Sequence, residues 1–224
     1  MPFRENNLND QPPPLDFPMM NDNEKSIVWS AARQFLYCAG CFAVTALEHA
    51  VAIIYKEKTF DENGFMENLQ LGELLFASAV FLAVSFRREN VKKLSIVFSA
   101  LCIFAACREL DNVFDDAIPL IGWKFAFVFI VASIGYALHH WQRTREELFN
   151  FLRHPSFLMM CCAMTIIIPV AQCVGHRSFV INVLQIEHVG EIKEFIEESI
   201  ETAGYFILLC SAIELFWPRK KRYL

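Results

Sequence analysis

The chain has 224 residues, of which 55% are hydrophobic and 20% are charged, and its formal net charge at pH 7 is -5. Water-soluble domains usually carry about 25% charged residues, so this composition favours a membrane protein. The acidic balance, with basic residues confined to short clusters beside apolar segments, excludes a nucleic-acid-binding protein.

The first 24 residues are polar, contain a run of three prolines and lack a basic, apolar leader. This composition predicts a disordered tail over residues 1–24 rather than a signal peptide. The remaining residues, 25–224, are expected to form one membrane domain. All eight cysteines lie inside or at the ends of apolar segments, where cysteine packs as a small hydrophobic residue, so we expect no disulfides.

Six apolar segments follow the tail, and each is long enough to cross a hydrocarbon core of about 30 Å at about 1.5 Å per residue. They predict an all-α integral membrane protein, a bundle of six transmembrane helices. Pro169 lies inside the fifth segment and is expected to kink it. The predicted helices cover residues 29–54, 67–86, 91–110, 123–141, 156–174 and 197–217.

An acidic amphipathic segment, about residues 179–198, precedes the last predicted helix. At about 100° per residue its glutamates fall on one narrow stripe, with apolar residues on the other side. We expect the first three glutamates to form the wet face of an interfacial helix and the last two to enter the membrane. The stripe consists of Glu187, Glu191, Glu194, Glu198 and Glu201.

The distribution of basic residues predicts the orientation. Most of the 20 Lys and Arg residues lie before the first helix, between helices two and three, between helices four and five, and after the last helix. These four regions share one side of a six-helix protein, and the cytoplasmic side carries the excess of Lys and Arg. We therefore expect a multi-pass protein of the inner membrane with both termini in the cytoplasm.

Charged residues also occur in the outer parts of the predicted helices, all at a similar depth. A charge at the bilayer centre costs about 2.5–3.5 kcal/mol, so such residues usually face a bundle interior or a water-filled cavity. Arg108 and Asp111 have the i, i+3 spacing that allows an ion pair. The predicted polar site consists of Glu48, Glu73, Arg108, Glu109, Asp111, Glu198 and Glu201.

Carboxylates outnumber basic groups in this set, so either some of them are protonated or a bound cation completes the site. The first hypothesis is therefore binding or movement of a cation, a proton or a small solute. So small a carrier would be expected to work as a homo-oligomer or with another membrane protein. The lipid bilayer is the partner that the composition itself implies.

Two alternatives stay open. One is a membrane-embedded, metal-dependent hydrolase acting on a lipid-like substrate, in which carboxylates and histidines would hold a divalent cation. Its candidate ligands are His49, His176 and His188, although no metal-binding or nucleophile motif accompanies them. The other alternative is a non-catalytic membrane sensor or docking module. Whether the chain is an enzyme is therefore not decided by its sequence.

Overall fold

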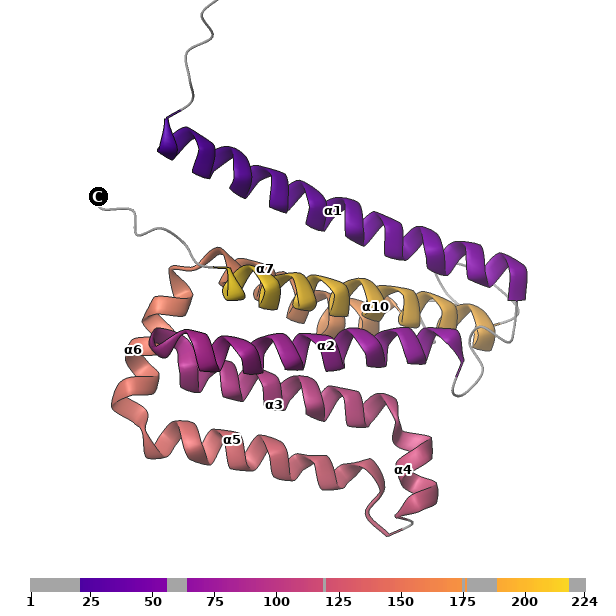
Figure 1. Ribbon diagram of the computed structural model, residues 1–224. Helices are drawn as coiled ribbons and strands as arrows, with labels where there is room; N and C mark the ends of the chain where they lie inside the picture. Colours follow the sequence, from indigo (N-terminus) through magenta and orange to yellow (C-terminus); the bar gives the residue numbers. More distant parts are fainter. Residues whose placement is uncertain (1–20, 56–63, 119, 175, 177–188, 218–224) are drawn as a thin grey trace, which may run out of the picture. The chain divides into compact units, whose positions relative to one another are not determined.

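A computed structural model describes residues 21–55, 64–118, 120–174, 176 and 189–217. Within these ranges the chain forms helices and no β-strand, which confirms the all-helical prediction (Figure 1). The chain divides into two compact units, residues 1–36 and residues 37–224, and the division falls inside the first helix. The second unit contains all of the predicted site residues.

The first helix, α1 (Asp22–Tyr55), begins ahead of its predicted start at Trp29. A reciprocal cap explains the earlier start. The Glu24 backbone N–H donates to the Asn21 Oδ1 at 2.9 Å, and the Asn21 N–H donates to the Glu24 Oε2 at 2.8 Å. Such a capping box satisfies two backbone donors that a helix start otherwise leaves unpaired. The helix thus takes in the end of the predicted tail, while residues 1–20 lie outside the described residues.

Six stretches of the described helices are long and apolar enough to cross a membrane: Glu24–Tyr55, Phe65–Arg87, Glu89–Glu109, Gly122–His139, Pro155–Val174 and Phe195–Phe216. They coincide with the six predicted segments. The elements after α1 are α2 (Phe65–Arg87), η2 (Glu89–Val91), α3 (Lys92–Glu109), α4 (Asp111–Ala117), η3 (Gly122–Ala126), α5 (Phe127–His139), α6 (Trp141–Leu152), α7 (Pro155–Thr165), η4 (Ile166–Val170), α8 (Ala171–Val174) and α10 (Val189–Phe216).

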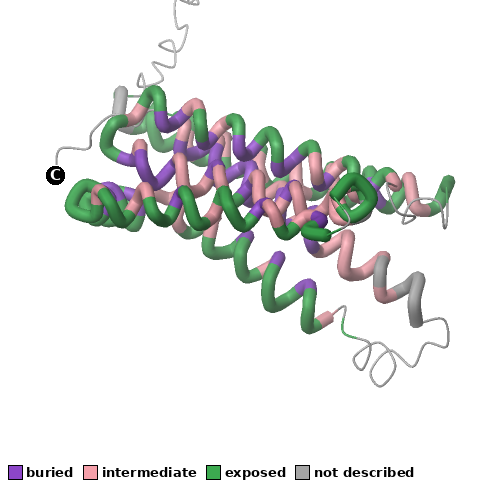
Figure 2. Tube along the Cα trace, turned by 90° about the horizontal axis from the view of Figure 1, so that it is seen from below, coloured by how far each residue is buried: buried purple, intermediate pink, exposed green. Residues whose placement is uncertain are grey.

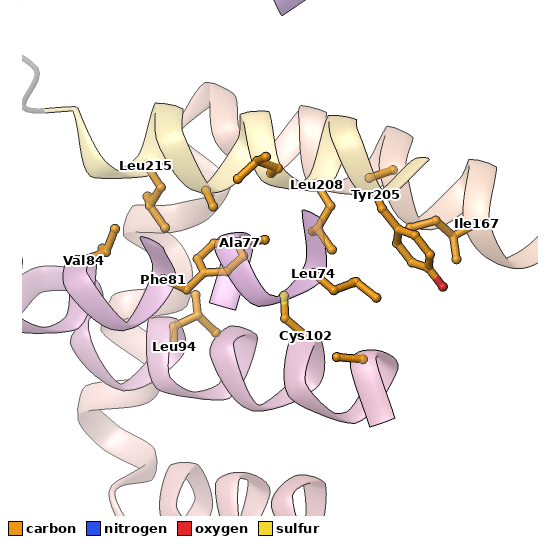
Figure 3. Packing of buried hydrophobic residues seen from close by; sticks show 14 of the residues in the cluster. Leu74, Ala77, Phe81, Val84, Leu94, Cys102, Ile167, Tyr205, Leu208 and Leu215 are labelled. Carbon is orange, nitrogen blue, oxygen red and sulfur yellow. The ribbon is translucent and has the colours of Figure 1, made fainter. Parts of the chain in front are cut away.

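The apolar core of the second unit lies where α2, α3, α7 and α10 meet. Leu74 and Phe81 of α2 contribute fully buried side chains, and Leu215 of α10 is equally buried (Figure 3). Apolar residues are also exposed along the helices, for example Val131 of α5 at 69%. Figure 2 shows exposed positions along the outer sides of the helices and buried positions between them. Apolar side chains on both the inner and the outer surface are expected of helices that lie in a bilayer.

Hydrogen-bonded serines join the helices within this core. The Ser78 and Ser99 hydroxyls lie 2.8 Å apart between α2 and α3. Between α7 and α10, the Ser156 Oγ donates to the Ser211 carbonyl at 2.6 Å, and the Ser211 Oγ donates to the Ser156 carbonyl at 2.9 Å. Small hydroxyl residues allow close helix approach and hydrogen-bond across the interface, as is usual between membrane helices.

Two features add detail to the sequence prediction. Pro169 lies in η4, a single π-helical turn between α7 and α8, because proline has no N–H for the regular helical bond and its ring displaces the preceding carbonyl. The last helix, α10, runs without interruption from Val189, so the described part of the acidic amphipathic segment is the start of this helix rather than a separate element. Residues 177–188 lie outside the described residues, Glu187 and His188 among them.

Candidate functional site

The first of three groups in the polar site is ion-paired, the arginine cluster, formed by Arg108, Glu109, Glu201 and Tyr205. The Arg108 Nη2 lies 2.8 Å from the Glu109 Oε1 and 3.2 Å from the Glu201 Oε2. The Tyr205 hydroxyl donates to the Glu109 Oε1 at 2.7 Å and accepts from the Arg108 Nη2 at 3.2 Å. Each member therefore bonds at least one other member across the interface of α3 and α10.

Helix geometry explains why these four side chains meet. Glu201 and Tyr205 are four residues apart on α10, so they lie on one face. Arg108 lies in the last turn of α3, where the helix dipole favours a positive charge. Figure 3 shows Tyr205 at the edge of the apolar core, with its hydroxyl directed away from the labelled leucines.

A second group, the glutamine cluster, consists of Gln70 on α2 with Glu198 and Thr202 on α10. The Gln70 Nε2 donates to the Glu198 Oε2 at 2.6 Å and to the Thr202 Oγ1 at 3.1 Å. The Thr202 hydroxyl in turn donates to the Glu198 carbonyl at 2.8 Å. Gln70 and Thr202 are both fully buried, so this group ties α2 to α10 in the interior.

The third group, the buried carboxylate pair, is formed by Glu48 of α1 and Glu73 of α2. Their side chains are 1% and 7% exposed, and they lie within electrostatic range of each other. Across the described residues, neither Glu48 oxygen has a hydrogen-bond partner, and the same holds for the Glu73 Oε2. Thr202 is a neighbour of Glu48, but its one donor is already used on the Glu198 carbonyl.

The three groups form one continuous polar band. Glu73 follows Gln70 by three residues on α2, and Glu201 follows Glu198 by three residues on α10, so each helix contributes to two groups. Glu198 also lies within electrostatic range of Glu109. The structure therefore brings together six of the seven predicted site residues: Glu48, Glu73, Arg108, Glu109, Glu198 and Glu201.

Asp111 is the seventh predicted residue, and it does not share one continuous helix with Arg108. Helix α3 ends at Glu109, and Asp111 begins the separate helix α4. The two residues are therefore not three apart on one continuous helix, which was the basis for expecting their pair. The ion pairs described above join Arg108 to Glu109 and Glu201.

The metal-ligand candidates are not assembled in the described part of the chain. His49 and His176 are both exposed, and His188 lies outside the described residues. Among the residues that the structure describes, no group of three or more His, Cys, Asp or Glu side chains is arranged to hold a metal ion. The eight cysteines, all described, are free thiols.

Three residues of the band were not among the predicted site residues: Gln70, Thr202 and Tyr205. Each lies one helical turn from a predicted carboxylate, Gln70 before Glu73, Thr202 after Glu198 and Tyr205 after Glu201. A search for polar side chains at i±3 and i±4 from each buried carboxylate would have found all three.

The fold and the band define a helical protein with six membrane-capable segments and an acidic interior site. No family model matches this chain, and comparisons with curated proteins and with solved structures found no match. The function must therefore be argued from the chemistry of the band.

Proposed function

We propose that this chain is a multi-pass protein of the inner membrane, a six-helix bundle with both termini in the cytoplasm, that binds and moves a cation through its acidic band. The proton is the cation that fits best. One observation carries the proposal: both Glu48 carboxyl oxygens, the Glu73 Oε2 and the Gln70 Oε1 are buried acceptor atoms without a donor among the described residues.

The chemistry of these acceptors requires a positive charge or a donor. An ionised carboxylate accepts hydrogen bonds and cannot donate, and burying it without a partner is costly. Two such groups side by side in an apolar interior increase that cost, because they repel each other. A proton on one carboxyl group gives it an O–H donor. A second carboxylate or an amide oxygen can accept the hydrogen bond from that donor. A divalent metal would need a larger ligand set than the described residues assemble.

The arginine cluster gives the site a second kind of carboxylate. Arg108 stays charged at all physiological pH values, and it forms ion pairs with Glu109 and Glu201. Glu48 and Glu73 have no such cation in contact within the described residues, and Glu198 accepts a neutral amide donor. The band thus joins permanently paired carboxylates to exchangeable ones, as a proton-conducting chain of side chains requires.

Glu73→Gln should abolish proton movement, because glutamine keeps the shape of the side chain but cannot take up a proton. We expect wild-type protein in liposomes to acidify the lumen under an inside-negative potassium diffusion potential, read by a trapped pH-sensitive dye. Glu73→Gln should lower the initial rate about ten-fold or more, the effect usual for loss of a proton-transferring side chain.

The matched control for this assay is Glu146→Gln, which removes an exposed carboxylate from α6 and should conduct like wild type. Glu48→Gln should reproduce the loss. If both buried variants conduct like the control, the exchangeable carboxylates are not the proton route and the proposal is wrong.

The proposed orientation predicts opposite results for fusions at two points of the chain. Green fluorescent protein fused after Leu224 should fluoresce, because it folds in the cytoplasm. Alkaline phosphatase fused after Ile118, between α4 and η3, should be active, because it requires the periplasm. The reverse pattern, measured in intact cells, would invert the topology without affecting the site.

A further inference from the structure

We propose that α6 is a binding surface for anionic phospholipid headgroups at the cytoplasmic face of the membrane. The proposal uses the membrane placement argued above but not the proton chemistry of the band. Helix α6 joins two membrane-capable stretches, Gly122–His139 and Pro155–Val174, and Figure 1 shows it running across the end of the helices rather than along them. With 12 residues it is too short to cross a membrane itself.

Polar contacts fix α6 against the rest of the bundle. The Thr144 Oγ1 donates to the carbonyls of Ala137 at 2.9 Å and of His140 at 3.2 Å. The Glu147 Oε2 accepts the Leu94 backbone N–H at 3.0 Å, which satisfies one of the unpaired donors at the start of α3. These contacts set which face of α6 points outward.

An aromatic anchor completes the inner face. The Phe151 ring lies 5.0 Å from that of Phe98 on α3 and 5.7 Å from that of Phe157 on α7. Phe151 is 2% exposed, and it lies four residues after the buried Glu147. The inner face of α6 is therefore occupied by contacts with α3, α5 and α7.

The outer face combines basic and large apolar side chains. Arg143 and Arg145 are exposed, as are Trp141, Leu148 and Phe149. The Arg145 guanidinium lies 5.8 Å from the centre of the Phe149 ring. Arginine next to exposed aromatic and aliphatic side chains is the pattern of a helix that lies in the headgroup region, with apolar groups inserted and guanidinium groups on phosphate.

Charge complementarity favours an anionic lipid over a zwitterionic one. Arg143, Arg145 and Arg153 are all exposed on or beside α6, where the exposed carboxylate of the helix is Glu146. Glu147 is buried against the α3 backbone, and Glu89 is paired with Lys92 at 3.0 Å. The cytoplasmic leaflet carries the anionic lipids that attract such juxtamembrane basic residues.

The test is native mass spectrometry of the full-length protein in detergent, titrated with dioleoylphosphatidylglycerol or dioleoylphosphatidylcholine. We expect wild-type protein to retain the phosphatidylglycerol about ten-fold more strongly, and the variant Arg143→Gln/Arg145→Gln to lose that preference. The control Lys124→Gln/Lys193→Gln removes the same charge from the starts of η3/α5 and α10, away from α6, and should keep the preference.

Two results would overturn the proposal: an unchanged preference in the α6 variant, or an equal loss in both variants, which would indicate a general charge effect. Excess inorganic phosphate should not displace the lipid, since the apolar contacts of α6 are absent with the free ion. Both arginines are exposed, so the unfolding temperature in phosphatidylcholine should not change. Proton uptake by the α6 variant should equal that of wild type, which separates this proposal from the function of the band.

Discussion

Replacing Arg108 with Gln should lower the free energy of unfolding by about 3 kcal/mol, because it leaves two buried carboxylates without their cation. The Glu109 and Glu201 side chains are 8% and 5% exposed, so water cannot replace the lost contacts. Arg108 itself is 39% exposed, and this solvent contact places the expected cost at the low end of the range for a broken buried pair.

A double-mutant cycle isolates the interaction behind this loss. Arg108→Gln/Glu201→Gln should be more stable than Arg108→Gln alone, because the second change removes one of the uncompensated charges. The measurement is reversible unfolding in mixed micelles, followed by helical circular dichroism. An additive cycle would contradict the pairing, and equal stability of Arg108→Gln and wild type would show that the cluster does not stabilise the fold.

Gly204→Ala should lower the free energy of unfolding by about 1–3 kcal/mol, because α10 packs closely against η4 at this position. A Cβ atom on residue 204 would lie 2.5 Å from the Ile167 Cγ1 and 3.2 Å from the Ile166 Cγ2. The Ile167 atom belongs to the inner part of a buried side chain, so it cannot move aside without shifting the helix. Unfolding in mixed micelles measures this loss as well.

Two other glycines provide matched controls for the same substitution. A Cβ atom on Gly72 in α2, or on Gly135 in α5, would meet no atom within 4 Å. Gly72→Ala and Gly135→Ala should therefore be neutral or stabilise by about 0.5–1 kcal/mol, since alanine restricts the unfolded chain more than glycine does. If all three variants behave alike, helix propensity and not the α10–η4 contact determines the stability at position 204.

The membrane-capable helices were predictable because each depends on local composition. A run of about 20 apolar residues must form a helix if it lies in a bilayer, whatever its neighbours are. The same counting predicted that Glu48, Glu73 and Glu201 face the bundle interior, and all three residues are buried. The capping box at Asn21 was equally local, and recognising it would have placed the start of α1 correctly.

The contacts between helices were not predictable in the same way, because they depend on which faces meet. The spacing of Arg108 and Asp111 suggested an ion pair within one helix, and α3 in fact ends between them. The ion pair of Arg108 with Glu201 joins distant parts of the chain, and nothing in the local spacing indicated it. Helix α6 was not predicted, since its polar composition resembles that of a loop and it is stabilised by contacts such as the one between Glu147 and Leu94. Tertiary contacts of this kind leave little trace in the sequence around each residue.

The nitrogen and the oxygen of the Gln70 amide have different surroundings in the acidic band. Its nitrogen donates to the Glu198 Oε2 at 2.6 Å, so its oxygen must point the other way, and that oxygen is buried without a donor among the described residues. Half a turn about the last side-chain bond would place that oxygen against the Glu198 Oε2 and against the Glu198 carbonyl oxygen, both of which accept from the nitrogen. Glu198 therefore fixes the amide in the orientation that leaves the Gln70 Oε1 without a donor among the described residues, and an isotope-edited infrared band of Gln70 would report a proton donor that binds there.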